Sequence, residues 1–260
     1  MATVLPSAPK AGTVYLVGAG PGAAELLTLR AIRVLGQADV VFHDALVSRE
    51  ILDLAPQAEK IAVGKRSGRF STAQRFINKQ LADTARKHRV VVRLKGGDPM
   101  LFGRAHEEID FLRKNSIQVE VVPGITAAAA ASAEIGISLT RRGAARSVAF
   151  VTPRVGQGEA PSNWIGAALA ADTVAIYMAA GEADAIAASL IAAGKPRATP
   201  VALVENASLP EQRAIYGRLH ELGALAAELS SGPALILLGE VFSEAAAAAR
   251  PAQRRRAQTR

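Results

Sequence analysis

The sequence predicts an α/β protein with two domains, each built on a mainly parallel sheet. Short apolar runs rich in β-branched residues alternate along the chain with longer segments of helical periodicity. This alternation favours parallel pairing, because each helix must cross back over the sheet before the next strand begins. A chain of 260 residues is long enough for one large or two medium α/β domains.

In the first half, strands are expected near 13–18, 38–43, 60–63, 89–94 and 118–122. The run Val90-Val91-Val92 is typical, since β-branched side chains fit a pleated sheet. Helices are expected near 25–36, 48–55, 72–87, 103–114 and 126–135. The first repeats leucine and isoleucine at helical spacing, and Ser71-Thr72-Ala73-Gln74 is typical of a capping box that opens the third.

In the second half, strands are expected near 147–152, 173–178, 200–205, 212–217 and 234–239, with helices near 163–170, 181–193 and 218–229. Periodicity is lost from Ser138 to Arg146, which predicts a domain boundary there. We therefore expect a flexible N-terminus at 1–12, domains at 13–138 and 139–245, and a basic disordered tail at 246–260.

Composition excludes several kinds of site. The chain has no cysteine, which excludes disulfides, thiolate metal sites and cysteine nucleophiles. Its four histidines show no paired metal-ligand spacing, so no metal is expected. No apolar run approaches the ~18 residues that span a bilayer, and the first residues lack a secretory signal. A cytoplasmic protein that does not enter membranes is expected.

The segment 93–104, Arg-Leu-Lys-Gly-Gly-Asp-Pro-Met-Leu-Phe-Gly-Arg, is the most informative part of the chain. It follows an apolar strand and precedes a helix, which is where ligands bind in an open α/β sheet. Gly96 and Gly97 permit close approach of a ligand to the main chain, and Asp98-Pro99 fixes the turn. We therefore predict a ligand-binding loop.

A second glycine turn, Gly18-Ala19-Gly20-Pro21-Gly22, follows the first strand. Together with Ala23 it satisfies the G-x-G-x-x-A pattern of dinucleotide-binding turns, and Asp39 or Asp44 lies where a ribose-binding acid is expected. A nicotinamide oxidoreductase is therefore one interpretation. It accounts for this turn alone.

Taken in chain order, GAGPG, HDALV, GKR, KGGDPMLFGR, VVPGITA, YM and ALVENAS resemble the tetrapyrrole methylase family, in particular its uroporphyrinogen-III C-methyltransferases. The resemblance extends from about Thr13 to about Val241. It implies two α/β domains that enclose a cofactor cleft, usually in a homodimer. It also implies methyl transfer from S-adenosylmethionine to C2 and C7 of uroporphyrinogen III, giving precorrin-2, a precursor of siroheme or cobalamin. No metal, membrane or nucleic-acid partner is expected.

The resemblance assigns two catalytic residues. Asp44 follows the apolar run 40–43 and matches the proposed proton acceptor, a carboxylate that would stabilise positive charge on a pyrrole. Lys65 matches the proton donor or substrate-orienting cation. The alternative for Asp44 is an N-cap of the following helix, and for Lys65 a surface lysine.

The resemblance also assigns the cofactor site, in which glycines expose the backbone, Asp98 accepts from a ribose hydroxyl or an ammonium, and Met178 contacts adenine. Core packing of Met178 and helix capping by Thr126 are the alternatives. The full set is Pro21, Gly96, Gly97, Asp98, Leu101, Thr126, Ala127, Met178 and Ala207.

Basic residues near strand ends predict an anionic substrate, because arginine binds carboxylates with two parallel hydrogen bonds and uroporphyrinogen carries eight carboxylates. Lys95 is expected among these cleft cations. The substrate-binding candidates are Arg66, Arg104, Arg141 and Arg142. Two positions depart from the family pattern: Ala23 replaces an aspartate, and Arg141 replaces a histidine.

Three alternatives to this function remain open. A methylase of the same family could act on a later corrin precursor at another carbon. An RNA methyltransferase of the same fold would suit the isoelectric point of about 10.2 and the arginine-rich tail, but the chain has only 4% aromatic residues. The third alternative is a nicotinamide oxidoreductase or a binding module without catalytic activity. Measuring the equilibrium binding of S-adenosylhomocysteine and of NAD would separate these possibilities.

Overall fold

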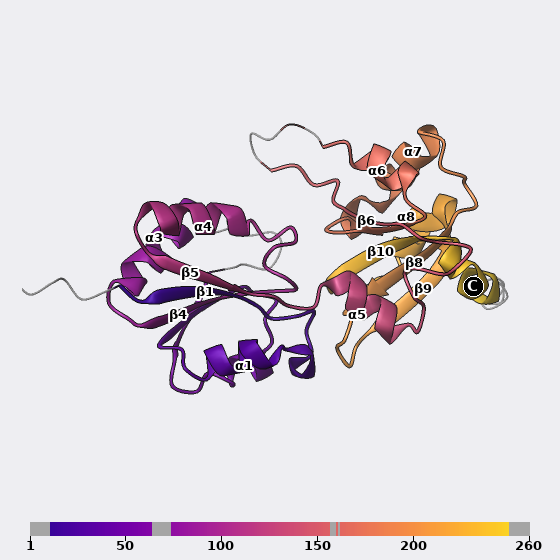
Figure 1. The fold of residues 1–260 in the computed structure, drawn as a ribbon. Coiled ribbons are helices and arrows are strands. Elements are labelled where there is room, and N and C mark those ends of the chain that lie inside the picture. The colour runs from indigo at the N-terminus through magenta and orange to yellow at the C-terminus, as the bar shows by residue number, and fades with distance from the viewer. Residues whose placement is uncertain (1–10, 64–73, 157–159, 161, 250–260) are drawn as a thin grey trace, which may run out of the picture. The chain divides into compact units, whose positions relative to one another are not determined.

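A computed structural model describes residues 11–63, 74–156, 160 and 162–249 of the chain. It divides into two compact units, Met1–Thr126 and Ala127–Arg260, each with a five-stranded sheet (Figure 1). The α/β class and the presence of two sheets agree with the sequence prediction.

The first sheet is parallel throughout, with strand order β3-β2-β4-β1-β5. A parallel sheet brings the carboxyl ends of its strands to one edge, so the loops that follow β1, β2, β4 and β5 lie at the same edge. The strands are β1 (Thr13–Gly18), β2 (Val40–His43), β3 (Glu59–Ala62), β4 (Val90–Lys95) and β5 (Gln118–Val122).

Helices cover both faces of this sheet. Buried side chains of α3 and α4 pack on one face beside Leu16 and Phe42, while α1 packs on the other beside Val17 and Val41 (Figure 1). Alternate residues of β1 thus serve two cores, which is why the strand is apolar on both sides. The helices are α1 (Leu29–Leu35), α2 (Arg49–Leu52), α3 (Gln74–Ala85) and α4 (Ala105–Lys114), with a 3₁₀ turn at Ala24–Leu26.

The second sheet is mixed, which corrects the expectation of mainly parallel sheets. Its order is β6-β7-β10-β8-β9, and only β6 and β7 pair in parallel. The seven residues between β8 and β9 contain no crossover helix, so these strands pair antiparallel. The strands are β6 (Val148–Val151), β7 (Thr173–Ile176), β8 (Pro200–Glu205), β9 (Arg213–Arg218) and β10 (Ala234–Gly239).

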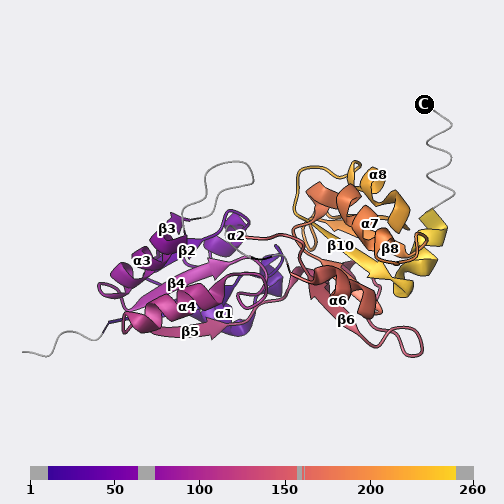
Figure 2. The same ribbon diagram turned by 90° about the horizontal axis from the view of Figure 1, so that it is seen from above.

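In the second unit, α6, α7 and α8 cover one face of the sheet (Figure 2), and α5 packs on the other (Figure 1). Ile186 and Leu190 of α7 belong to the first of these two cores. The helices are α5 (Ala127–Glu134), α6 (Trp164–Ala170), α7 (Ala183–Ala192) and α8 (Leu222–Ala226), with 3₁₀ turns at Ala180–Glu182, Leu219–Glu221 and Glu240–Phe242.

The expected domain limits differ from the structure at three places. Helix α5 belongs to the second unit, because Ala128 and Ala131 are buried beside Leu235 and Leu237 of β10, so the boundary lies at 126/127 instead of 138/139. Residues 243–249 are helical and Ala246 is fully buried, so the expected tail begins too early. Gly12 was expected in the flexible N-terminus, but its N–H donates to Ala85 O at 2.7 Å and the residue directly precedes β1. The described residues contain no helix long and apolar enough to cross a bilayer.

Candidate active site

Three glycines bring together the loops that follow β1, β4 and β5. A Cβ on Gly18 would lie 2.6 Å from Gly124 Cα, and a Cβ on Gly124 would lie 2.3 Å from Gly97 O. No side chain fits at these contacts, so glycine is required at 18 and 124 for the backbones to approach. The close packing fixes three loops at one edge of the first sheet.

Two further contacts fix the loop that follows β4. Gly20 and Gly97 form an isolated antiparallel bridge, with N–H groups donating to each other's carbonyl at 3.2 and 2.7 Å. The Asp98 carboxylate accepts from Met100 N at 2.8 Å and from Gly124 N at 2.9 Å. Asp98 thus joins this loop to the loop that follows β5. The ribose or ammonium contact expected of it is a proposal, while its backbone contacts are present in the structure.

Gly97 leaves an open surface within this loop. Its φ is +67°, and apart from its two chain neighbours no described residue has an atom within 4 Å of the position a Cβ would take. Gly96, beside it, is exposed. The two glycines therefore leave backbone accessible at the carboxyl edge of the sheet, where ligands bind in open α/β folds.

Asp44 lies at the same edge, directly after β2, with a side chain that is 31% exposed. Its Oδ1 accepts from Arg93 Nη2 at 2.5 Å, and no other described residue donates to the carboxylate. The expected alternative, an N-cap, is wrong: α2 begins at Arg49, and Ser48 Oγ accepts from Ile51 N at 3.5 Å. Asp44 therefore has one oxygen fixed by an arginine, while its other oxygen accepts no hydrogen bond from the described residues.

Behind Asp44 lies a buried charge cluster formed by Arg93, Lys95 and Glu108. Arg93 Nε donates to Glu108 Oε1 at 3.2 Å, and Lys95 Nζ donates to Glu108 Oε2 at 3.0 Å. Burial, followed by the neighbouring charge of Arg93, lowers the pKa of Lys95, and Glu108 opposes this shift. The expectation that Lys95 is a cleft cation is wrong, because its side chain is 5% exposed and paired inside the unit.

The segments that carry the expected cofactor residues of the second unit are joined through Tyr177. Ala128 N, next to Ala127, donates to Oη of Tyr177, the residue before Met178, at 3.2 Å. Tyr177 and Ala207 both pack against the core under α5. Met178 is 49% exposed with φ +56°, so the core-packing alternative does not describe it.

Residues 13–223 match the family of Tetrapyrrole (Corrin/Porphyrin) Methylases. The chain belongs to the tetrapyrrole methylase family. The uroporphyrin-III C-methyltransferase of Thermus thermophilus, solved in complex with S-adenyl homocysteine, is 42% identical with a TM-score of 0.78, over 89% of this chain and 99% of that chain. A cobalt precorrin-4 methyltransferase is 27% identical with a TM-score of 0.77, over 88% and 95%.

Among curated proteins, a siroheme synthase of Psychrobacter cryohalolentis is 46% identical over 235 residues, which are 89% of this chain and 45% of that protein. The chain thus spans about half the length of the curated relatives that it matches. Membership of the methylase family therefore rests on most of the chain, whereas the individual site residues rest on the geometry given above.

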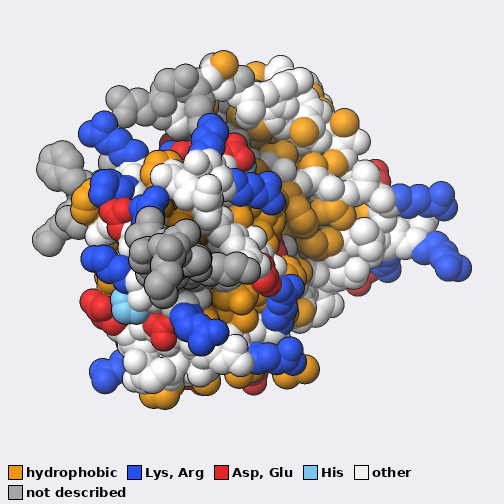
Figure 3. Space-filling view, turned by 60° about the vertical axis from the view of Figure 1, so that its left-hand side comes forward, with side chains coloured by type: hydrophobic (Ala, Val, Ile, Leu, Met, Phe, Trp, Pro, Cys, Tyr) orange, Lys and Arg blue, Asp and Glu red, His pale blue; other side chains and the backbone are white. Residues whose placement is uncertain are grey.

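The predicted cations are distributed unevenly. Lys65 and Arg66 lie outside the described residues. Arg104 donates to Glu107 through two nitrogens, at 2.6 and 2.8 Å, and Arg141 pairs with Glu244 at 3.1 Å in the second unit, where Arg142 is exposed. Figure 3 shows Lys and Arg side chains spread among apolar ones on the presented face. Any substrate carboxylate would compete with Glu107 and Glu244 for these guanidinium groups.

Sequence reasoning missed Glu108, although its position carried a signal. Ala105, Ile109 and Leu112 form the buried face of α4, and Glu108 lies among them at helical spacing. A carboxylate on an apolar helix face is rarely buried without a cationic partner. The two cations that end β4 were therefore candidates for that partner.

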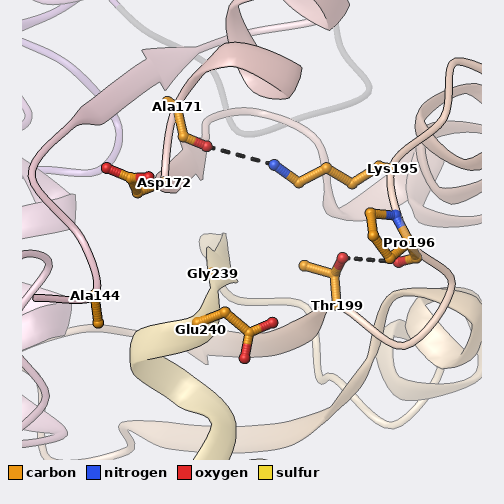
Figure 4. Close-up of a pocket in the computed structure, with 8 residues that line it drawn as sticks. All are labelled: Ala144, Ala171, Asp172, Lys195, Pro196, Thr199, Gly239 and Glu240. Atoms are coloured by element: carbon orange, nitrogen blue, oxygen red, sulfur yellow. Dashed lines mark hydrogen bonds between the residues drawn. The ribbon is translucent and has the colours of Figure 1, made fainter.

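A pocket in the second unit takes no part in this arrangement (Figure 4). It lies where β7 and β8 begin, whereas Met178 and Ala207 follow the ends of these strands. Two of its charged side chains already have partners: Lys195 Nζ donates to Ala168 O at 2.8 Å, and hydrogen bonds from Arg146 N and Ser147 lower the pKa of Asp172. The lining residues are Ala144, Ala171, Asp172, Lys195, Pro196, Thr199, Gly239 and Glu240.

Asp98→Ala should weaken S-adenosylhomocysteine binding about tenfold and destabilise the fold by ~1–3 kcal/mol, because Met100 N and Gly124 N lose their acceptor. Calorimetric titration and thermal unfolding measure the two effects. Asp172→Ala is the matched control, since Asp172 also accepts from two backbone N–H groups, in the second unit. It should lower the melting temperature without changing affinity. Equal affinity losses in both variants would contradict a local role for Asp98.

Proposed function

We propose that the chain methylates uroporphyrinogen III at C2 and C7 with S-adenosylmethionine as donor, giving precorrin-2. The observation that carries this proposal is the 42% identity over 99% of the Thermus uroporphyrin-III C-methyltransferase. Identity to the cobalt precorrin-4 methyltransferase is lower, at 27%, which favours the first methylation step over a later one. The precorrin-2 product is a precursor for either siroheme or cobalamin.

Bound S-adenosylmethionine would supply a methyl group on a sulfonium, an electrophile that needs no metal. Gly96, Gly97 and Leu101 of the first unit would hold it beside Pro21, with Thr126 at the end of that unit. The cofactor residues assigned to the second unit are Ala127, Met178 and Ala207. Such positioning excludes water and aligns the reacting atoms, and it accounts for much of the rate of an alkyl transfer.

Asp44 would act on the pyrrole ring. Alkylation of a ring carbon leaves positive charge, which a nearby carboxylate stabilises and relieves by accepting a proton. Asp44 supports this role because Arg93 fixes one oxygen and the side chain is 31% exposed. Lys65 would donate a proton or orient the substrate, and Arg66, Arg104, Arg141 and Arg142 would bind its carboxylates. No described group of three or more His, Asp or Glu residues could hold a metal.

The proposal includes a homodimer in the cytoplasm with no nucleic-acid partner. Incubation of the purified protein with S-adenosylmethionine and enzymatically generated uroporphyrinogen III tests the activity. The product should show the mass of two added methyl groups and the spectrum of precorrin-2. Methylation of a later corrin precursor, with none of uroporphyrinogen III, would replace the proposed substrate.

Removal of residues 250–260 should leave this rate unchanged. The segment adds five arginines, but every residue assigned to the site precedes it. An RNA methyltransferase would instead depend on these cations for phosphate binding, increasingly so at low salt. Steady-state rates of the full-length and shortened proteins, with RNA as a second acceptor, separate the two cases. Loss of activity on truncation, or tail-dependent RNA methylation, would overturn the porphyrinogen assignment.

A further inference from the structure

Glu108 is the most buried charged residue near the candidate site. It lies on α4 with no exposed surface, and three side chains donate to its carboxylate. Oε1 accepts from Arg93 Nε at 3.2 Å and from Gln74 Nε2 at 3.0 Å, and Oε2 accepts from Lys95 Nζ at 3.0 Å. A buried carboxylate with this many donors is held in one orientation.

The charges of the cluster balance when Asp44 is included. Two cations, Arg93 and Lys95, lie between two carboxylates, those of Asp44 and Glu108. Arg93 joins the carboxylates directly, since Nε donates to Glu108 and Nη2 to Asp44, while Nη1 donates to Leu94 O at 3.1 Å. The guanidinium plane is rigid, so the direction of its bond to Asp44 depends on the bond to Glu108.

We infer that Glu108 is a positioning residue for methyl transfer, which acts through Arg93 to orient the Asp44 carboxylate. The inference rests on the proposed function of Asp44 as the carboxylate that faces the substrate. Without the charge of Glu108, Asp44 is the one anionic partner that the described part of the chain offers Arg93, which then shares a buried site with an unpaired Lys95. The guanidinium then moves toward Asp44 and changes the direction of its free oxygen.

The cofactor loop has separate supports. Gly97 is bridged to Gly20, and Asp98 is bonded to Gly124, at contacts that do not include Glu108. Loss of the Glu108 charge should therefore lower kcat and leave cofactor affinity nearly unchanged. A purely structural role would instead lower stability and cofactor affinity together.

Full-length Glu108→Gln should lose about tenfold to hundredfold in kcat, because a misdirected reacting group has an effect of this size. KM for uroporphyrinogen III and the affinity for S-adenosylhomocysteine should change little. Asp110→Asn is the matched control, since it removes one carboxylate from an exposed position of the same helix. It should leave kcat unchanged.

A double-mutant cycle with Asp44→Asn decides how Glu108 acts. If it acts through Asp44, Glu108→Gln in the Asp44→Asn background should cause no further loss of rate. Losses that multiply, or full activity in folded Glu108→Gln, would overturn the inference. If Glu108→Gln does not fold, the same cycle is measured in a Lys95→Met background. In that background Glu108→Gln leaves one cation, Arg93, and one carboxylate, Asp44, so the cluster stays neutral. Absence of product from the wild-type protein would instead overturn the proposed function.

Discussion

Gly97→Val should reduce the affinity for S-adenosylhomocysteine about a hundredfold or more. The residue has φ +67°, where a β-branched side chain is strained by about 1–2 kcal/mol or more. Apart from the two chain neighbours, the described residues place no atom within 4 Å of the position that a Cβ would take, so the new methyl groups would occupy the open side of the loop. That side is where we propose that the cofactor binds. Calorimetric titration with S-adenosylhomocysteine, and with NAD for the nicotinamide alternative, measures the effect.

Gly136 provides a matched control for the backbone strain. It follows α5 in the second unit with φ +66°, and its Cβ position likewise has no atom of a described residue within 4 Å other than its chain neighbours. Gly136→Val should therefore lower the melting temperature by a similar amount while the affinity stays normal. Normal affinity in a folded Gly97→Val protein would show that this loop does not bind the cofactor, and NAD binding by the wild type would favour the nicotinamide interpretation.

The strands were predictable because their patterns are local. Each of β1, β4, β8 and β10 is a short, largely apolar segment, and all four lie within a residue or two of the expected ranges. The direction of β10 relative to its neighbours was not predictable in this way. The partners of β10 are β7 and β8, which are distant in sequence, and alternation of strands and helices alone favours parallel pairing.

The domain boundary was misplaced for a related reason. Helix α5 reads Ala-Ala-Ala-Ala-Ala-Ser-Ala-Glu, so it has no distinct apolar face that would indicate which sheet it packs against. Its small side chains permit close packing on β10, which only the tertiary structure reveals. The sequence loses its periodicity only in the segment that follows α5. The boundary was therefore expected too far toward the C-terminus.

Within the candidate site, the glycine loops were predictable and the charged partners were not. Glycine and Asp-Pro carry their own conformational preferences, whereas the partner of a charged side chain depends on the fold. Lys95 and Glu108 meet across 13 residues, and Asp44 and Arg93 across 49. The sequence therefore predicted Lys95 as a cation of the cleft and Asp98 as a ligand-binding residue, without the buried partner of the first or the backbone contacts of the second.

Asp44→Asn should slow methyl transfer by ~10² or more, the loss expected when a general base is removed. Asparagine keeps the size of the side chain and an oxygen that can accept from Arg93 Nη2, but it has neither the charge nor the basicity of aspartate. Arg93 keeps its bond to Glu108, so the fold should persist with a modest fall in melting temperature. Single-turnover methylation with saturating cofactor measures the rate, and thermal unfolding confirms the fold.

Asp83→Asn is the matched control for this substitution. Asp83 is also paired with an arginine, Arg86, at 2.8 Å, but on the exposed surface of α3. Its replacement should leave the rate unchanged, so a loss confined to Asp44→Asn would reflect the carboxylate at the end of β2. Because Ser48 and not Asp44 caps α2, loss of a helix cap cannot account for a slower reaction. An unchanged rate in Asp44→Asn would reduce Asp44 to an ion-pair partner of Arg93 and leave Lys65 as the leading candidate for proton transfer.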